Sequence, residues 1–590
     1  MENEFWQRAN QAIAHLSGRE DYGNTAFENE KRSYPYAMTD FLAGNRARAI
    51  AFLQQPDRDA EANAHTLGID FYPSFTLKGQ IRKYFFFGEF LDPAYRQRMY
   101  DAAKIWTEFD PKGRPHPLYG MGNGGEGWDQ QARGGWVDGR NTDNLRAMRD
   151  VAVYLMAEET GNESVRLLYK DRLLAYARSL YFIGMGEWDS ETYHGHTITA
   201  YANLYDFAKD AEVRLLGKAV LDWLHATGAL KYWRGAFGGP TKRDYSRGNA
   251  TWKALATSEL GMYFGDSPVE NPSPYHDVVH LITSSYRPPL AVVALARKQF
   301  DKPLELLNAK PTYENWKPGN SDAPQFHETL YFGHTFQVGT LPRGSGGDWN
   351  GFKLMAFNSQ RGVDYFIAST GDNPKKISTS STGADNVAQY RHLILWLSRV
   401  GDSPFQFFLP KTVEPTAVNG VWFLKYERTW LALHPINLQI QGINAEATAQ
   451  LQDWYPGDRI LTAKGVGKNA SGFALEIGEP ETHGTFAEFQ QAVLARSHLD
   501  VTNLVAGQAE FTGTTGERVK LQMQERGLPV VWRNGKLHNW RDHFALYQNA
   551  DGSKAPIALA WKQGRLYVEA GGDRFESQLT REGTYSFQNK

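Results

Sequence analysis

Apolar residues recur at three- and four-residue spacing through the first half of the chain, which is the spacing of one face of an α-helix. The pattern predicts helices joined by loops rich in Gly and aromatic residues, with Gly161 ending one of them. The predicted helices span residues 93–106, 143–160, 163–181, 197–209, 211–226, 251–263 and 289–299. Successive helix pairs with long loops at one end are typical of an α/α toroid, an incomplete barrel in which inner and outer helices alternate.

The pattern changes after about residue 308. Short segments rich in aromatic and β-branched residues follow one another, separated by Gly, Asn, Asp and Pro, which predicts antiparallel strands and a β-sandwich. A chain of 590 residues also exceeds what one hydrophobic core holds. We therefore predict an α+β multidomain protein with a toroid over 1–307 and β-sandwich structure over 308–590, with a further division near residue 500 as an option.

The composition favours a carbohydrate ligand over a nucleic acid. Aromatic residues make up 13% of the chain, and their faces can stack on sugar rings as well as fill a core. The formal net charge is −2, and no run of Lys or Arg marks a nucleic-acid partner. An anionic ligand would therefore need a local cluster of basic residues.

The absence of cysteine removes several function classes. Without thiols the chain has no disulfides, no thiolate metal site and no Cys nucleophile. No apolar run approaches the roughly 18 residues of a membrane span, so membrane insertion is not expected. The N-terminus lacks the basic segment and apolar core of a signal peptide. We expect a periplasmic or secreted protein whose signal is missing from this sequence, and a cytoplasmic location stays open.

Two histidines and three tyrosines between residues 188 and 210 form the candidate reaction centre, because such side chains can move a proton between substrate atoms. His196 and Tyr205 are nine residues apart and would occupy opposite faces of one helix, so His196 is expected in the preceding loop. His194 and Tyr201 are seven apart, share a face and form the alternative pair. Tyr193 is interpreted as a packing residue.

Amide and guanidinium groups flank this segment. Asn141 and Asn144 lie upstream, and Arg243 and Arg247 lie downstream around Tyr245. Such groups hold and neutralise a carboxylate. Neutralisation of a sugar carboxylate makes the neighbouring C–H acidic enough for β-elimination, which requires no metal and no organic cofactor. A glycine-rich loop over residues 118–139 carries two further candidates for substrate binding, Trp128 and Trp136.

The block HTITAYANLY resembles the HTxxAYxxxY signature of the chondroitin AC and hyaluronate lyase family. The resemblance implies a toroid followed by β-sandwich domains, and it implies catalytic roles for His196 and Tyr205. It further implies that Asn144, which lies 196 − 144 = 52 residues before His196, and the pair Arg243 and Arg247 bind the substrate carboxylate. In the more loosely similar heparinase-II-like, alginate and glucuronan lyases, a β-domain histidine enters the cleft. His327 and His334 are the candidates for that part, and His334 is the one we assign to substrate binding.

The sequence leaves two other functions open. The carboxylates of Glu126, Asp129, Asp189 and Glu191 are compatible with an inverting glycoside hydrolase, which requires two carboxylates across the cleft. A glycan-binding protein without catalysis is the third option. The arginine pair with Tyr and His favours a lyase whose substrate is an anionic, uronate-containing polysaccharide.

Overall fold

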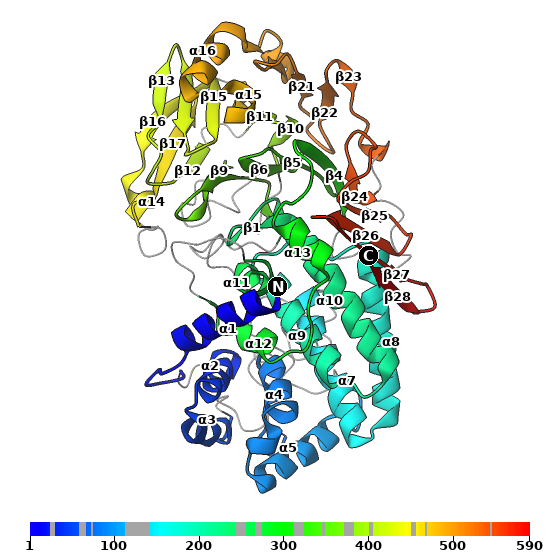
Figure 1. Cartoon of the computed structure of the whole chain (residues 1–590). Helices are drawn as coiled ribbons and strands as arrows, with labels where there is room; N and C mark the ends of the chain where they lie inside the picture. Colours follow the sequence, from blue (N-terminus) through cyan, green and yellow to red (C-terminus); the bar gives the residue numbers. More distant parts are fainter. Residues whose placement is uncertain are drawn as a thin grey trace.

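The computed structural model shows a helical part and a β part stacked on each other (Figure 1). The structure describes residues 1–23, 30–57, 66–71, 75–111, 142–242, 255–265, 274–311, 324, 326–344, 349–370, 383–399, 405–449, 456–466, 469–542 and 545–590. Residues up to 303 form mainly helices and those after it mainly antiparallel strands. The predicted order of a helical toroid followed by β-sandwich structure is confirmed.

The helices of the first part follow the apolar periodicity of the sequence. They are α1 (Glu2–Leu16), α2 (Glu30–Leu42), α3 (Arg46–Leu53), α4 (Thr76–Phe85), α5 (Pro93–Trp106), α7 (Asp143–Thr160), α8 (Glu163–Phe182), α9 (Tyr193–Phe207), α10 (Ala211–Lys231), α11 (Leu255–Phe264), α12 (Val278–Ile282) and α13 (Leu290–Ala296).

Local signals set several of these helix ends. The Asp92 side chain caps α5 by accepting from the backbone N–H groups of Ala94 and Tyr95, and Asp210 caps α10. Gly161 ends α7 in the left-handed conformation, with φ of 75°. The predicted bounds of α5 and α7 agree with the structure, but α9 begins four residues earlier than predicted.

The helices form two rows, as a toroid requires. In the inner row α2 packs on α4, α4 on α7, α7 on α9 and α9 on α11. In the outer row α8 packs on α10 and α10 on α13. Each outer helix follows its inner neighbour along the chain, so inner and outer helices alternate. This arrangement places α9 against α7, α10, α11 and α12 at once.

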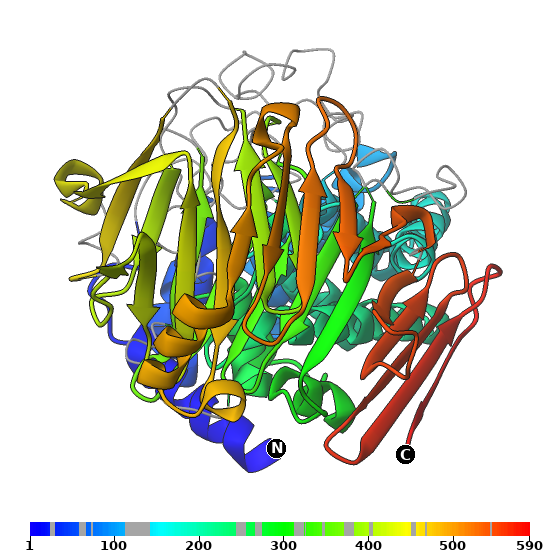
Figure 2. The same cartoon turned by 90° about the horizontal axis from the view of Figure 1, so that it is seen from above.

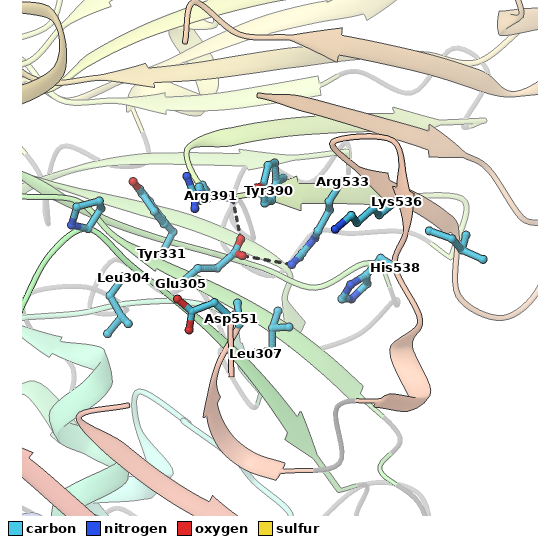
Figure 3. A pocket seen from close by; sticks show the side chains of 13 residues that line it. Leu304, Glu305, Leu307, Tyr331, Tyr390, Arg391, Arg533, Lys536, His538 and Asp551 are labelled. Atoms are coloured by element: carbon cyan, nitrogen blue, oxygen red, sulfur yellow. Dashed lines mark hydrogen bonds and ion pairs between the residues drawn. The ribbon is translucent and has the colours of Figure 1, made fainter. Parts of the chain in front are cut away.

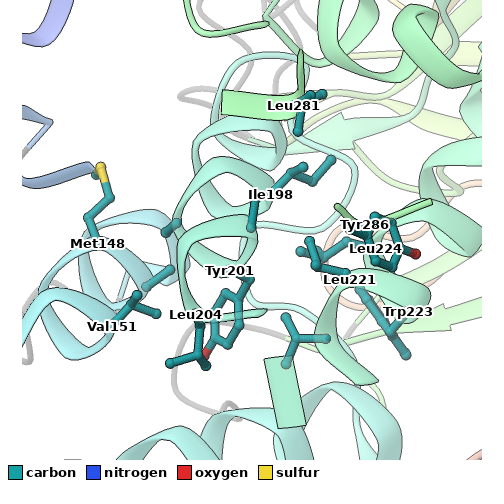
Figure 4. Close-up of a cluster of buried hydrophobic side chains, with 14 of the residues drawn as sticks. Met148, Val151, Ile198, Tyr201, Leu204, Leu221, Trp223, Leu224, Leu281 and Tyr286 are labelled. Carbon is teal, nitrogen blue, oxygen red and sulfur yellow. The ribbon is translucent and has the colours of Figure 1, made fainter. Parts of the chain in front are cut away.

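The buried face of α9 contributes to the helical core (Figure 4). Ile198, Tyr201 and Leu204 of α9 belong to the same hydrophobic cluster as Leu221 and Leu224 of α10. The burial of one such side chain stabilises the fold by about 1.5–3 kcal/mol. Packing therefore fixes the rotation of α9 and decides which of its residues face away from this core.

Three main sheets make up the second part. The strands of the helix-facing sheet are, in spatial order, β16 (Leu438–Ile443), β17 (Arg459–Gly465), β12 (Phe405–Leu409), β9 (Gly362–Ser369), β8 (Phe352–Asn358), β6 (Phe336–Thr340), β5 (Phe326–Phe332), β4 (Leu304–Lys310), β24 (Ala545–Asn549), β25 (Ile557–Ala560), β26 (Arg565–Ala570), β27 (Asp573–Leu579) and β28 (Tyr585–Asn589). A six-stranded sheet contains β10 (Asn386–Tyr390), β11 (Leu393–Ser398), β18 (Ser471–Gly478), β15 (Trp430–Ile436), β14 (Val421–Lys425) and β13 (Thr416–Val418). A five-stranded sheet contains β19 (His498–Asp500), β20 (Gln508–Thr512), β21 (Arg518–Gln522), β22 (Val530–Arg533) and β23 (Lys536–Leu537).

Several strands and helices of the protein are short. They are the strands β1 (Tyr232–Trp233), β2 (Ala236–Phe237), β3 (Thr241–Lys242) and β7 (Trp349–Asn350), and the helices α14 (Ala445–Ala449), α15 (Pro480–His483) and α16 (Phe486–Arg496).

An aromatic core joins the first two sheets into a sandwich. Phe352 and Phe366 of the large sheet lie in one cluster with Trp396 and Phe473 of the six-stranded sheet, and the Phe352 and Trp396 ring centroids are 5.9 Å apart. The five-stranded sheet, in orange in Figure 2, packs through a second apolar cluster on β10 and β11. This layering agrees with the predicted sandwich.

The last five strands return to the helical part (Figure 2). Strands β26 and β27 pack on α13, and Tyr585 donates a hydrogen bond of 2.5 Å to Asp222 of α10. The predicted boundary at residue 307 lies within β4, because the change from helix to strand occurs between Ala296 and Leu304. The division of the chain into domains, including one near residue 500, stays a prediction.

Gly339 of β6 is a point of close contact between the two parts. A Cβ atom there would lie 2.4 Å from the Gly239 carbonyl oxygen and 2.6 Å from Pro240 Cδ. We predict that Gly339→Ala lowers the midpoint of thermal unfolding, because overpacking of this kind costs about 1–3 kcal/mol. Gly351→Ala is the matched control, since its Cβ would meet no atom within 4 Å. Equal midpoints for the two variants would contradict the proposed close packing.

Candidate active site

The segment between α8 and α9 carries three buried carboxylates, at alternate positions. These are Glu187, Asp189 and Glu191. Glu187 accepts hydrogen bonds from the backbone N–H and the side-chain amide of Asn144, at 3.0 and 2.7 Å. The buried Asn144 therefore connects the start of α7 to this segment. The sequence predicts that Asn144 binds the substrate carboxylate, and in the structure its side-chain amide binds the carboxylate of Glu187.

Asp189 joins the helical part to the β part. Its Oδ2 lies 3.0 Å from Lys310 Nζ of β4 and 3.6 Å from Lys231 Nζ of α10. Both lysines also contact Glu328 of β5, so two carboxylates and two ammonium groups neutralise each other inside the protein. Burial opposes ionisation of Asp189, but the two lysines outweigh it and hold its pKa below the ordinary value.

Glu191 makes the second connection of this kind. Its carboxylate forms an ion pair with Lys353 of β8, and its carbonyl accepts from the N–H of Ala256 in α11. A buried pair of this type costs about 3–5 kcal/mol to break by removal of one partner. The segment before α9 is thus held from both sides, which fixes where α9 begins.

The first turn of α9 brings a tyrosine and a histidine together. Ser190 Oγ accepts from the backbone N–H of Tyr193 at 3.0 Å, so the helix starts at Tyr193. Three residues later His196 lies on the same face, with its ring centroid 6.1 Å from that of Tyr193. The ring of Phe75 packs on His196 at 4.6 Å. Tyr193 and Phe75 are half-buried, whereas His196 is 6% exposed.

A buried ion pair orients the His196 ring. Lys78 of α4 forms an ion pair with Asp277, and its Nζ lies 3.1 Å from His196 Nδ1. Asp277 Oδ2 is 3.5 Å from the same nitrogen. Because an ammonium group only donates, His196 Nδ1 accepts from Lys78, and a neutral ring then carries its proton on Nε2. The histidine is thereby prepared to donate a hydrogen bond from Nε2.

Aromatic rings extend from this centre. The ring of His276 stacks on Tyr275 at 4.1 Å and lies 5.1 Å from Tyr36, over which Arg19 places its guanidinium at 4.0 Å. Tyr36 and Tyr275 are half-buried. We define Lys78, Tyr193, His196, His276 and Asp277 as the α9 site.

The arrangement corrects the predicted position of His196. The residue lies in the first turn of α9 and not in the loop before it. Tyr205 lies in the last turn of the same helix, about 13.5 Å further along the axis and half a turn round. There it packs against Tyr286, and burial together with Asp206 and Asp222 raises its pKa. His196 and Tyr205 therefore do not meet.

The alternative pair faces the protein interior. His194 is fully buried and donates from Nε2 to the Leu224 carbonyl at 2.8 Å, and burial lowers its pKa. Tyr201 stacks on Tyr176 at 5.6 Å, and burial raises its pKa, with Asp150 adding to the shift. Both residues are buried and stabilise the packing of α9, and Figure 4 shows Tyr201 within the apolar cluster.

The two candidate histidines of the β part lie at opposite ends of β5. His334 is exposed in the turn after the strand. His327 is buried with its ring 5.6 Å from Trp540. It lines a cavity of about 410 Å³ together with Phe326 and Trp349. Phe326 also contacts Trp188, at 5.5 Å, so this aromatic-lined cavity adjoins the segment before α9.

Several predicted site residues lie outside the described part of the chain. They are Asn141, Arg243, Tyr245, Arg247, Trp128 and Trp136, together with the carboxylates Glu126 and Asp129. Among the residues that the structure does describe, no group of three or more His, Asp or Glu side chains is placed to hold a metal ion. None of the described helices has the length and apolar character to cross a membrane.

Lys78 and Asp277 are site residues that the sequence did not predict, and Tyr193 was predicted to be a packing residue. Lys78 and Asp277 are 118 and 81 residues from His196 in the sequence, so no local spacing connects them. Tyr193 and His196 do have the three-residue spacing of neighbours on a helix. An earlier helix start would have revealed that pair.

Comparison with known proteins gives similar solved structures but no match among protein families or curated proteins. Among solved structures, a mutant heparan sulfate lyase from Pedobacter heparinus shares 10% identity, with 91% of this chain and 90% of that chain covered and a TM-score of 0.38. A heparinase III with methylated lysines shares 10% identity over the same fractions, with a TM-score of 0.36. At this similarity neither neighbour identifies the activity of this chain.

Glu259 of α11 lies under the α9 site as a buried acid. Its carboxyl makes no hydrogen bond with the described residues, and a side chain on Gly195 would meet it at 2.7 Å. Burial raises its pKa well above 4.5, and Asp277 adds to the shift, against the opposing effect of Lys78. The folded protein therefore holds this carboxyl protonated over a pH range in which the unfolded chain ionises it.

This raised pKa predicts a pH-dependent stability. The contribution of Glu259 is fully present below about pH 4.5 and is lost as the pH rises through its folded-state pKa. Glu259→Gln mimics the protonated acid, so the excess of its unfolding midpoint over that of the wild type should grow as the pH rises above about 4.5. The exposed Glu446→Gln is the control. If the difference in unfolding midpoint between Glu259→Gln and the wild type does not change with pH, the pKa of Glu259 is not raised in the folded protein.

Proposed function

We propose that this protein is a polysaccharide lyase that cleaves a uronate-containing anionic polysaccharide by β-elimination at the α9 site. The observation that carries the proposal is the pairing of Tyr193 with His196, beside the buried Lys78 and Asp277, at a surface lined with aromatic rings. Such a reaction requires groups that transfer a proton and aromatic side chains on which sugar rings can stack.

In the proposed reaction, Tyr193 is the proton carrier. Its phenolate takes the proton from the carbon next to the sugar carboxylate. The electron pair of that C–H bond forms a carbon–carbon double bond, and the glycosidic C–O bond breaks. The resulting phenol returns the proton to the departing oxygen, so the tyrosine ends as it began. We assign the role of proton carrier to Tyr193 and no longer to Tyr205, because Tyr193 is the tyrosine beside His196.

His196 and its partners stabilise the charge that develops. With Nδ1 held by Lys78, the Nε2–H of His196 can donate to the substrate carboxylate as it becomes enolate-like. Asn141, Arg243 and Arg247 are proposed to neutralise the same carboxylate. Trp128, Trp136 and Tyr245 are proposed to bind neighbouring sugar units. Asn144 is proposed to act by holding Glu187, and thereby the segment before α9.

The described carboxylates do not favour a hydrolase. Asp189 is held ionised between two lysines, and Glu191 is paired with Lys353, both out of contact with water. A general acid needs a raised pKa and access to the leaving oxygen, and the pKa of Asp189 is lowered.

A substrate of polymeric size is met outside the cytoplasm, so a periplasmic or secreted location stays part of the proposal.

The proposal predicts different effects for two tyrosines of one helix. Tyr193→Phe should reduce turnover by about 10²–10⁴-fold, the usual contribution of acid–base catalysis, while it leaves polysaccharide binding largely intact. Tyr205→Phe is the matched control and should retain activity. The measurement is the ultraviolet absorbance of the unsaturated product on incubation with glucuronan, alginate, hyaluronan or chondroitin.

Three outcomes would contradict this account. If Tyr205→Phe is inactive and Tyr193→Phe is active, the proton carrier is Tyr205, at the other end of α9. Reducing ends that accumulate without an unsaturated product would identify a hydrolase. Binding without either signal on all four polymers would identify a glycan-binding protein.

A further inference from the structure

A second pocket lies on the face of the large sheet that is turned away from the helices (Figure 3). Side chains alternate between the two faces of a strand. In β4, Leu304 and Leu306 join the core shared with the helices, and Lys310 reaches Asp189 on that same side. Glu305 and Leu307 point to the opposite face, where they line the pocket, and Leu304 also borders it at the start of the strand. The pocket is thus separated from the α9 site by the sheet itself.

The size and composition of the pocket suit a small polar ligand. Its volume is about 380 Å³, within the range of about 300–1,000 Å³ for ligand sites. The cations that line it are Arg391, Arg533 and Lys536, and the rings are those of Tyr331 and Tyr390. Figure 3 shows Arg533 and Lys536 on one side of Tyr390 and Arg391 on the other.

Glu305 holds two of these groups in place. Its carboxylate accepts from the backbone N–H of Arg391 at 2.6 Å and from Arg533 Nη1 at 3.2 Å. Arg533 Nη2 donates to Thr329, whereas its buried Nε–H makes no hydrogen bond with the described residues. Glu305 and Thr329 thus hold the Arg533 guanidinium in a fixed position at the pocket wall.

The strand register adds an uncompensated charge. Arg533 and Lys536 are direct partners in the β22–β23 pair, and Lys536 is exposed without an ion pair to any described residue. Like charges directly opposite each other on two strands are destabilising, and an anion between them would relieve the repulsion. Asp551 at the rim stays ionised, since hydrogen bonds from Ser553 lower its pKa. Among the described groups that line the pocket, Arg391 is paired with Glu517 and Arg533 with Glu305, which leaves Lys536 as the cation available to an anion.

We propose that this pocket binds an acidic sugar unit, with its carboxylate or sulfate at Arg533 and Lys536. The guanidinium carbons of Arg391 and Arg533 lie 5.5 and 5.8 Å from the Tyr390 ring, so this ring helps to hold both arginines at the pocket wall. The pocket is a second glycan-binding site of the protein. It goes beyond the proposed reaction, since it requires no turnover, and it would hold the polymer while the α9 site acts on another segment of it.

The test is the binding of alginate and heparan sulfate oligosaccharides to the full chain by isothermal titration calorimetry, with dextran as the neutral comparison. The double variant Arg391→Ala/Lys536→Ala should weaken binding of the acidic oligosaccharides about 10-fold or more. Arg399→Ala is the matched control, because Arg399 is 45% exposed and 3.4 Å from a glutamate, as Arg391 is 49% exposed and 3.3 Å from one. It should bind like the wild type.

Turnover of a short oligosaccharide should be unchanged in the double variant, because its substitutions lie across the sheet from the α9 site. Equal affinities of the wild type and the double variant, or equal binding of dextran, would overturn this proposal even if the enzyme is active. Pocket-dependent binding with no turnover of any polymer would support it and refute the proposed function.

Discussion

The structure depends on the pairing of buried charges between the segment before α9 and lysines of the neighbouring elements. Asp189 lies between Lys310 of β4 and Lys231 of α10, and Glu191 meets Lys353 of β8. Charges inside a protein are tolerated only when they are paired and hydrogen-bonded. Displacement of the helices along the sheet would separate these pairs, so the pairing specifies how the two parts fit together.

This constraint determines what the first turn of α9 presents. The segment is held at Glu187, Asp189 and Glu191, and Tyr193 follows directly. Lys78 and Asp277 then fix the ring of His196 from the other side. The cations closest to this segment are therefore occupied with internal carboxylates. Because the net charge of the chain is −2, cations that recognise an acidic polymer must be local groups, as at Arg391, Arg533 and Lys536.

Much of the fold could be predicted from the sequence, because it follows from local patterns. The bounds of α5 and α7 follow from apolar periodicity and from Gly161, and the change to short aromatic segments marks the β part. The start of α9 was predicted four residues late. Thr192 at its N-cap position makes no side-chain cap, and Gly195 inside the first turn has poor helix propensity. Tertiary packing explains that glycine, since Leu255 and Glu259 leave no room for a Cβ atom.

The candidate site was predictable only in part. The segment 188–210 does contain the Tyr and His of the α9 site. The resemblance to the HTxxAYxxxY signature implied Tyr205, however, and the late helix start concealed the spacing that joins Tyr193 to His196. Lys78 and Asp277 reach His196 through the toroid, and such contacts leave no trace in sequence spacing. The cross-strand pair Arg533 and Lys536 likewise depends on a register that only the sheet defines.

The most direct test of this account is a crystal structure of the Tyr193→Phe variant with a bound uronate oligosaccharide. The account predicts a sugar carboxylate within hydrogen-bonding distance of His196 Nε2, with the ring of residue 193 next to the carbon that loses its proton. An oligosaccharide bound near Tyr205, or with no sugar in contact with the first turn of α9, would contradict it.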